Sequence, residues 1–301
     1  MLNNSQNSSD LYTLDEAYER IGHGRIQRVL AYVNSISRNS GAFFAYCYAY
    51  LILPQMYVCS PSGESTSEVY STCLAEDICA ARESGQPLDF TYKVDTSYEY
   101  YLNNWYVEMD LMCTPLTQIS LMYMWYFVGT ISGGVLAVIP DRIGRRKSVI
   151  GGMLVSLVAQ TVMLFVPSIL VRSICFFVMG LANLKNSQSY VWASESVPFE
   201  GRSGVFTVVN VVDAMPTLIT GTFYILISRD WFPIYAINVA VSFSALLLAL
   251  VCPESPRWLL YNGRQAEAIE ALNYMARFNG NSEDKFIPED AMFQETIKLA
   301  G

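Results

Sequence analysis

The chain has 301 residues, 52% of them hydrophobic and only 15% charged, with a formal net charge of −8. Soluble globular domains carry about 25% charged residues, so this composition indicates lipid rather than water as the main solvent. The single histidine argues against a histidine-based metal site or catalytic triad, and the lack of a Cys-x-x-Cys pair argues against a zinc ribbon.

Residues 1–35 form a polar segment without the apolar core of a cleavable signal peptide. Beyond it, six stretches are long and apolar enough to cross a hydrocarbon core, which takes about 20 helical residues. Because lipid offers no partner to unpaired backbone groups, we predict a helix for each stretch. The predicted spans are residues 36–58, 118–139, 148–166, 168–189, 204–228 and 231–252.

The segment between the first two spans, residues 59–117, carries the acidic charge of the chain. Its ten acidic and two basic residues give it a net charge equal to that of the whole protein. We interpret it as a solvated loop, with a field that concentrates cations at a mouth as the weaker alternative. Its cysteines predict two disulfides with three possible pairings, or else free thiols in an intracellular loop. The four candidates are Cys59, Cys73, Cys79 and Cys113.

Basic residues in the connection after the second span predict the orientation of the chain. Residues 141–147 contain four Arg or Lys side chains, which favours the cytosolic side, or the matrix side of a mitochondrial membrane. Counting spans then places the N-terminal segment, the connection after the fourth span and the C-terminal tail on the same side. Residues 59–117 fall on the opposite side.

Charged side chains inside the spans are candidates for function because they are costly in lipid. Lys185 in the fourth span and Asp213 in the fifth are candidate substrate-binding residues, with a structural ion pair inside the bundle as the alternative. Asn210, Gln188 and Tyr190 are expected to add hydrogen bonds in the same cavity, or else between helices.

Other features of the spans have structural interpretations. Arg38 at the start of the first span and Arg172 near the outer end of the fourth are expected to snorkel to the interface. Gly129 and Gly133 form a small-x-x-x-small pattern that permits close helix packing. After the last span, the helical period of residues 264–278 predicts an amphipathic helix on the inner membrane surface or against the bundle.

The connection after the second span resembles the signature loop of the major facilitator superfamily. Residues 141–146 read D-R-I-G-R-R directly after an apolar stretch. The family has Gly where this chain has Ala137, and Pro140 is a further departure. An Asp at the span end and the Arg residues can brace adjacent helices, while Gly144 supplies the turn.

Three further strings match branches of that superfamily. Residues 253–259, P-E-S-P-R-W-L, are similar to a string of the sugar-porter and organic-ion branches. Glu195, Pro198 and Arg202 resemble a pattern that follows the fourth span. Residues 108–113, E-M-D-L-M-C, resemble the element that distinguishes organic cation, anion and carnitine transporters, with Met in place of Trp at the second position.

The resemblance implies an all-α membrane protein that corresponds to one half of a major facilitator fold. A six-helix bundle at residues 36–252 would lie between the polar N-terminal segment and an inner-side amphipathic tail at residues 253–301. A complete member has twelve spans in two bundles around a central site. The resemblance also implies alternating access with an inner gate network. The implied gating residues are Asp141, Arg142, Gly144, Arg145, Arg146, Glu195, Arg202, Glu254 and Arg257.

We therefore expect a plasma-membrane transporter of small organic ions, with no enzyme activity, no cofactor and no metal site. The alternative is a transport-inactive, transporter-derived structural subunit of a larger complex, for example in the mitochondrial inner membrane. The expected partners are the lipid bilayer, a small organic solute, and a second six-helix half, a homodimer mate or a larger membrane complex. No nucleic-acid partner is expected.

Overall fold

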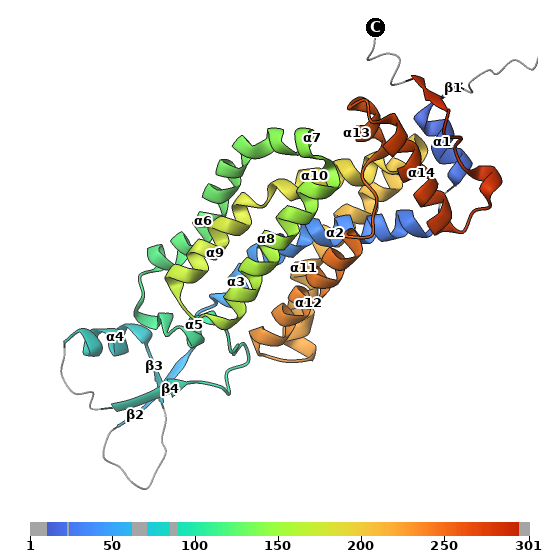
Figure 1. Ribbon diagram of the computed structural model, residues 1–301. Helices are drawn as coiled ribbons and strands as arrows, with labels where there is room; N and C mark the ends of the chain where they lie inside the picture. The colour runs from blue at the N-terminus through green and yellow to red at the C-terminus, as the bar shows by residue number, and fades with distance from the viewer. Residues whose placement is uncertain (1–10, 23, 62–70, 85–89, 295–301) are drawn as a thin grey trace, which may run out of the picture.

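The computed structural model describes residues 11–22, 24–61, 71–84 and 90–294. Long helices form a bundle, with a small domain of strands and helices at one end and a helical domain at the other (Figure 1). We call the end that carries residues 57–113 the outer end and the opposite one the inner end. Residues 1–10, the first part of the predicted polar segment, lie outside the described residues.

Five helical stretches among the described residues are long and apolar enough to cross a membrane. They coincide with the second to sixth predicted spans. Large apolar side chains are exposed along them, as expected where lipid replaces water. Their elements are α6 (Leu116–Gly134), η2 (Val135–Val138), α7 (Ile139–Ile143), α8 (Arg145–Phe165), α9 (Ile169–Leu181), α10 (Leu184–Glu195), η3 (Phe199–Gly201), α11 (Arg202–Leu226) and α12 (Trp231–Ala249).

The first predicted span differs from the structure in position and composition. Helix α2 runs over Arg25–Tyr46 and α3 over Tyr48–Leu51, so the helix begins before residue 36 and the chain is extended by residue 57. It is not among the apolar stretches because it lies inside the bundle, against α8, α10, α11 and α12. Its buried Asn34, Ser37 and Ser40 are therefore shielded from lipid. By position, α2 completes the six-helix bundle.

The fourth span is broken near its middle. Helix α9 ends at Leu181 and α10 begins at Leu184. At the break, the Asn183 side chain donates a hydrogen bond to Thr130 Oγ1 at 3.5 Å and accepts one from the side-chain amide of Asn186. Broken helices at membrane depth are a recurring feature of substrate sites in transporters.

Helices α6 and α9 approach each other at glycines. A Cβ atom built on Gly129 would lie 2.1 Å from the carbonyl oxygen of Phe177, and one on Gly180 would lie 2.1 Å from that of Tyr126. Any side chain larger than hydrogen would push these backbones apart. The prediction that the pattern at residues 129–133 serves close packing is confirmed.

The outer end carries a small sheet that the sequence analysis did not predict. Strands β2 (Tyr57–Pro61), β3 (Ser71–Cys73) and β4 (Phe90–Val94) are antiparallel in the order β3-β2-β4. Helices α4 (Ala75–Glu83) and α5 (Trp105–Glu108) and the turn η1 (Leu111–Cys113) lie beside it. The predicted disulfides are present, and the pairing is Cys59 with Cys73 and Cys79 with Cys113.

The inner end carries a helical domain built from both ends of the chain. It contains α1 (Leu14–Ile21), α13 (Pro256–Tyr261), α14 (Gln265–Asn279) and the turn η4 (Glu283–Lys285). Two short strands, β1 (Leu11–Tyr12) and β5 (Met292–Phe293), pair in parallel. Helix α14 confirms the predicted amphipathic helix, and its apolar face packs on α1, α13 and α2.

The segments that were predicted to share one side lie together at one end of the bundle. The α7–α8 connection contacts α13 through a hydrogen bond from Trp258 Nε1 to the Asp141 carbonyl at 2.9 Å. The connection after α10 contacts α1 through a hydrogen bond from the Phe199 amide to Asp15 at 3.2 Å. These segments share the inner end, while the disulfide-bonded domain lies at the outer end (Figure 1).

Candidate functional site

A cavity of about 620 Å³ opens between α2, α6 and α10. Its α6 wall is aromatic, because Tyr123, Tyr126 and Phe127 lie with ring centroids 5.1 to 6.1 Å apart. Tyr46 from α2 adds a fourth ring. The other polar lining residues come from α2, from α6 and from the region of the break between α9 and α10, and they are Arg38, Thr130, Asn183, Asn186 and Ser187.

An ion pair joins α2 and α11 at this cavity. Arg38 Nε lies 3.2 Å from Asp213 Oδ2, and both side chains are partly buried. The Arg38 guanidinium also lies 4.7 Å from the centre of the Tyr190 ring, whose hydroxyl donates a hydrogen bond to Asn210. Three of the five predicted substrate-binding residues are thus brought together around Arg38.

Arg38 itself was missed as a site residue. Because α2 begins at Arg25, Arg38 lies in the middle of a helix rather than at its start, and its interpretation as a snorkelling residue is wrong. The sequence signal was the intramembrane Asp213, which requires a cationic partner.

Lys185 lies on α10 directly after the break and is only 1% exposed. Its ammonium donates to Asn186 Oδ1 at 3.3 Å. Gly152 leaves room for the stem, since a Cβ there would lie 2.7 Å from Lys185 Cβ. Among the described residues, the ion pairs do not include Lys185, so it is not the partner of Asp213. Lys185 is not among the residues that line the cavity, but its hydrogen-bond partner Asn186 is.

Gln188, the fifth predicted substrate-binding residue, belongs to the inner network instead. Its Oε1 accepts a hydrogen bond from Arg145 at 3.2 Å. Arg145 also pairs with Asp141, four residues earlier, and lies 3.7 Å from Glu195 Oε2. The guanidinium of Arg145 on α8 thus brings together the predicted gating residues Asp141 on α7 and Glu195 on α10.

The N-terminus of α8 is held by Glu254. Its Oε1 accepts a hydrogen bond from the Arg146 amide at 2.8 Å, where the helix presents unpaired N–H groups. Gly144 has a φ of +106°, and a Cβ there would lie 2.3 Å from Glu254 Oε2. Glycine is therefore required both by the backbone and by the close carboxylate. Arg142 is exposed and makes no ion pair with another described residue.

Glu254 and Arg257, both implied gating residues, do not pair with each other. Arg257 lies 4.0 Å from Asp15, and Arg202 lies 3.9 Å from the same carboxylate. Asp15 was not among the predicted site residues. The local signal was a capping box, in which Thr13 and Glu16 exchange hydrogen bonds and start α1. This helix brings Asp15 to the two arginines.

Two more residues of the inner network were missed. Ser255 caps α13 and donates its hydroxyl to Glu195 Oε2 at 2.7 Å. The Tyr18 hydroxyl donates to the Glu195 carbonyl at 2.5 Å. Burial raises the pKa of Tyr18, so its hydroxyl stays protonated and remains a donor.

The E-M-D-L-M-C element anchors the outer domain. Glu108 Oε2 lies 2.8 Å from a nitrogen of Arg172, whose guanidinium is fully buried and lies 4.0 Å from the centre of the Trp105 ring. The expectation that Arg172 snorkels to the interface is therefore wrong. Asp110 pairs with Arg82 on α4 at 2.9 Å, and the cysteine of the element closes a disulfide to the same helix.

Comparison with known proteins identifies the family. The family model described as sugar (and other) transporter matches residues 69–298. The beta-alanine transporter of Drosophila melanogaster is 32% identical over 58% of this chain and 29% of its own length. Solute carrier family 22 member 2 of Homo sapiens is 26% identical over 64% of this chain and 35% of its own. Organic cation transporter 1 of Caenorhabditis elegans is 28% identical over 76% of this chain and 39% of its own length.

The chain spans about a third of the length of these relatives. The matched region contains the signature loop, the broken fourth span and residues 253–259. This chain belongs to the sugar (and other) transporter family of the major facilitator superfamily, in its organic cation transporter branch, and is a multi-pass integral membrane protein.

Proposed function

We propose that this chain forms one half of a carrier for small organic ions that works by alternating access. The observation that supports it most is the cavity between α2, α6 and α10, which joins an aromatic wall to the Arg38–Asp213 pair at a broken helix. Charged groups inside a membrane bundle are costly, and where they occur they usually pair with each other and mark the path of a substrate or a coupling ion.

The chemistry of the cavity suits an organic ion rather than a neutral sugar. Rings such as Tyr123 and Tyr126 attract cations to their faces. Arg38 and Asp213 supply one charge of each sign, and the beta-alanine transporter among the relatives is named for a zwitterion. We therefore include a cation, an anion and a zwitterion among the substrates to be tested.

The inner network has the properties of a gate in this proposal. Arg145 with Glu195, Arg202 with Asp15 and Arg257 with Asp15 lie 3.7 to 4.0 Å apart and are partly exposed. The two pairs at Asp15 are the more exposed ones, and exposed pairs contribute about 0–1 kcal/mol each, so they can separate and re-form at little cost. In this proposal they brace the bundle in one conformer and release it in the other.

Alternating access in this superfamily takes two bundles around one site. We propose that a second six-helix body completes the cavity, either as a covalent second half or as a homodimer mate. We also propose the plasma membrane as the location, since the outer domain carries two disulfides that require an oxidising compartment.

Uptake in cells that express the chain tests the site. Arg38→Gln and Asp213→Asn should each lower uptake about tenfold, which corresponds to about 1.4 kcal/mol, at equal amounts of protein in the membrane. Arg28→Gln, an exposed arginine on the same helix, is the matched control. The double variant Arg38→Gln with Asp213→Asn should remain as impaired as the singles, whereas recovery would assign the pair a purely structural role.

Mass measurement of the protein extracted in mild detergent tests the second bundle. A homodimer, or a complex with another six-span chain, is the expected result. A single copy held in a larger assembly without any other facilitator bundle would contradict the carrier proposal and support the alternative of a transport-inactive subunit.

A further inference from the structure

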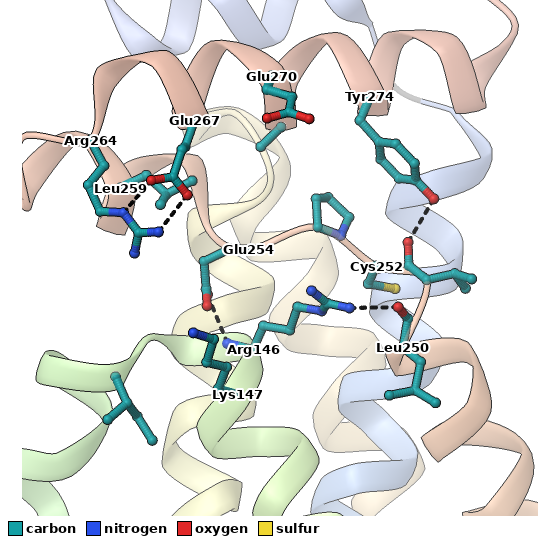
Figure 2. Close-up of a pocket in the computed structure, with 14 residues that line it drawn as sticks. Arg146, Lys147, Leu250, Cys252, Glu254, Leu259, Arg264, Glu267, Glu270 and Tyr274 are labelled. Atoms are coloured by element: carbon teal, nitrogen blue, oxygen red, sulfur yellow. Dashed lines mark hydrogen bonds and ion pairs between the residues drawn. The ribbon is translucent and has the colours of Figure 1, made fainter.

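A second cavity, of about 550 Å³, lies at the inner end where α8 and α12 meet α14. Two of its walls carry opposite charges (Figure 2). Arg146 and Lys147 at the start of α8 form the basic wall, and Glu267 and Glu270 on α14 form the acidic wall.

Most charged groups of this cavity already have partners. The Arg146 guanidinium donates to the Leu250 carbonyl at 2.6 Å, and Arg264 pairs with Glu267. The pKa of Glu267 is lowered by its hydrogen bond with Arg264 and, to a smaller extent, by the charge of Lys147. By contrast, Lys147 and Glu270 form no hydrogen bond or ion pair with another residue in the described part of the chain. One cation and one anion thus face the same cavity without partners.

The cavity lies where two apolar spans end. Helix α8 begins at Arg145 and the apolar stretch of α12 ends at Ala249, so both spans terminate at the cavity. Its lining continues into apolar side chains that are exposed, namely Ile143 at 44%, Leu250 at 51% and Val251 at 48%. A ligand that fills this site has a charged part and an apolar part.

We propose that this cavity binds the head group of a zwitterionic phospholipid with a primary amine, as in phosphatidylethanolamine. The phosphate lies against Lys147, the ammonium lies against Glu270, and the acyl chains follow Ile143 and Leu250. The inference is independent of transport by the chain.

The charges decide among the lipid classes. Three basic and three acidic side chains line the cavity, so an anionic lipid would meet as much repulsion as attraction. A quaternary choline ammonium has no N–H to donate, whereas a primary ammonium donates hydrogen bonds to a carboxylate. The six side chains are Arg146, Lys147, Arg264, Glu254, Glu267 and Glu270.

Native mass spectrometry of the delipidated full chain tests the proposal. The chain is incubated with phosphatidylethanolamine, phosphatidylcholine or phosphatidylglycerol of identical acyl chains at equal concentration. We expect about fivefold more of the first adduct than of either other lipid. Lys147→Gln and Glu270→Gln should each reduce this preference, and the double variant should abolish it. Lys285→Gln and Glu283→Gln on η4 are the matched controls, and all four positions are exposed.

Equal binding of the ethanolamine and choline lipids, or an unchanged preference in the double variant, would overturn the proposal. Soluble phosphoethanolamine distinguishes a lipid from a free amine-phosphate ligand. It should fail to displace the lipid at millimolar concentration, and full displacement would contradict a lipid site. Thermal unfolding of each variant shows whether the fold is retained.

Discussion

Arg172 is a buried charge that depends on a single acidic partner among the described residues. Its guanidinium is fully buried at the outer end, where Glu108 lies 2.8 Å away and the Trp105 ring 4.0 Å away. A buried charge of this kind is tolerated only when its partner is present, because removal of the partner leaves the charge without compensation. The pair also connects α5 of the outer domain to α9 of the bundle.

Glu108→Gln should therefore lower the free energy of unfolding by about 2 kcal/mol, since Arg172 stays buried while its countercharge is lost. Asp110→Asn is the matched control from the same element, because its pair with Arg82 is exposed and should cost less than about 1 kcal/mol. Denaturant unfolding of the purified chain measures both. Equal losses would show that burial of Arg172 does not dominate.

The capping box of α1 predicts a pH dependence at the inner end. Hydrogen bonds from the amide and then the hydroxyl of Thr13 lower the pKa of Glu16. Because the folded pKa lies below the unfolded one, this stabilisation is present above the unfolded pKa and is lost as pH falls through the folded value. Hydrogen-exchange protection of α1 should thus decrease below about pH 4.

Glu16→Gln should remove that decrease, because a neutral amide does not titrate in this range. Glu19→Gln, at an exposed position on the same helix, is the control and should behave as the unmodified chain does. A decrease that persists unchanged in Glu16→Gln would assign the titration to another carboxylate.

At the scale of elements, the contact between α6 and α9 tolerates the least change. Gly129→Ala or Gly180→Ala places a methyl group against a backbone carbonyl, which cannot move without its helix. Each should cost about 1–3 kcal/mol of stability, the usual range for overpacking. Gly134 is the last residue of α6, and a Cβ atom added there has nothing within 4 Å. Gly134→Ala should therefore be neutral or slightly stabilising. Thermal unfolding of the three variants checks the order.

The spans with a lipid-facing side were predictable from hydropathy, whereas α2, which other helices surround, was predicted with the wrong bounds. Spans two to six have continuous apolar runs because one side of each faces lipid. The predicted bounds of α2 were shifted along the sequence, because hydropathy alone does not find a helix that is surrounded by other helices. Strand β4 did carry a signal, since Phe90, Tyr92 and Val94 alternate with polar residues. This alternation was overlooked because residues 59–117 were interpreted from their charge alone.

The shifted bounds of α2 also explain why only part of the candidate site was predicted from the sequence. Asp213 was found from the cost of a charge in lipid, but its partner was not, because a helix starting at residue 36 puts Arg38 at the interface. The inner network was found in its family motifs, which are local strings. Asp15 and Ser255 complete it through tertiary contacts that no local string contains.

At the scale of the whole molecule, the outer domain has its own core, which includes Tyr57, Ile78 and Leu111. Replacing Cys79 and Cys113 together by Ala should destabilise this domain by about 4 kcal/mol, and replacing Cys59 and Cys73 by about 3 kcal/mol, because the first pair closes the longer loop. Limited proteolysis should cut the outer domain while circular dichroism retains the helical signal. Parallel loss of both signals would show that the bundle depends on the disulfides.

The pairing of β1 with β5 and of α1 with α14 also sets an order of events during synthesis. The apolar face of α1, with Leu14, Tyr18 and Ile21, is synthesised well before its partner, because α14 begins only at Gln265. At about 5–20 residues per second, the ribosome needs roughly 10–50 s to supply that partner. Throughout this interval the nascent chain must keep the face covered by the membrane surface or a chaperone. The inner end therefore docks only after all six helices of this bundle have been synthesised.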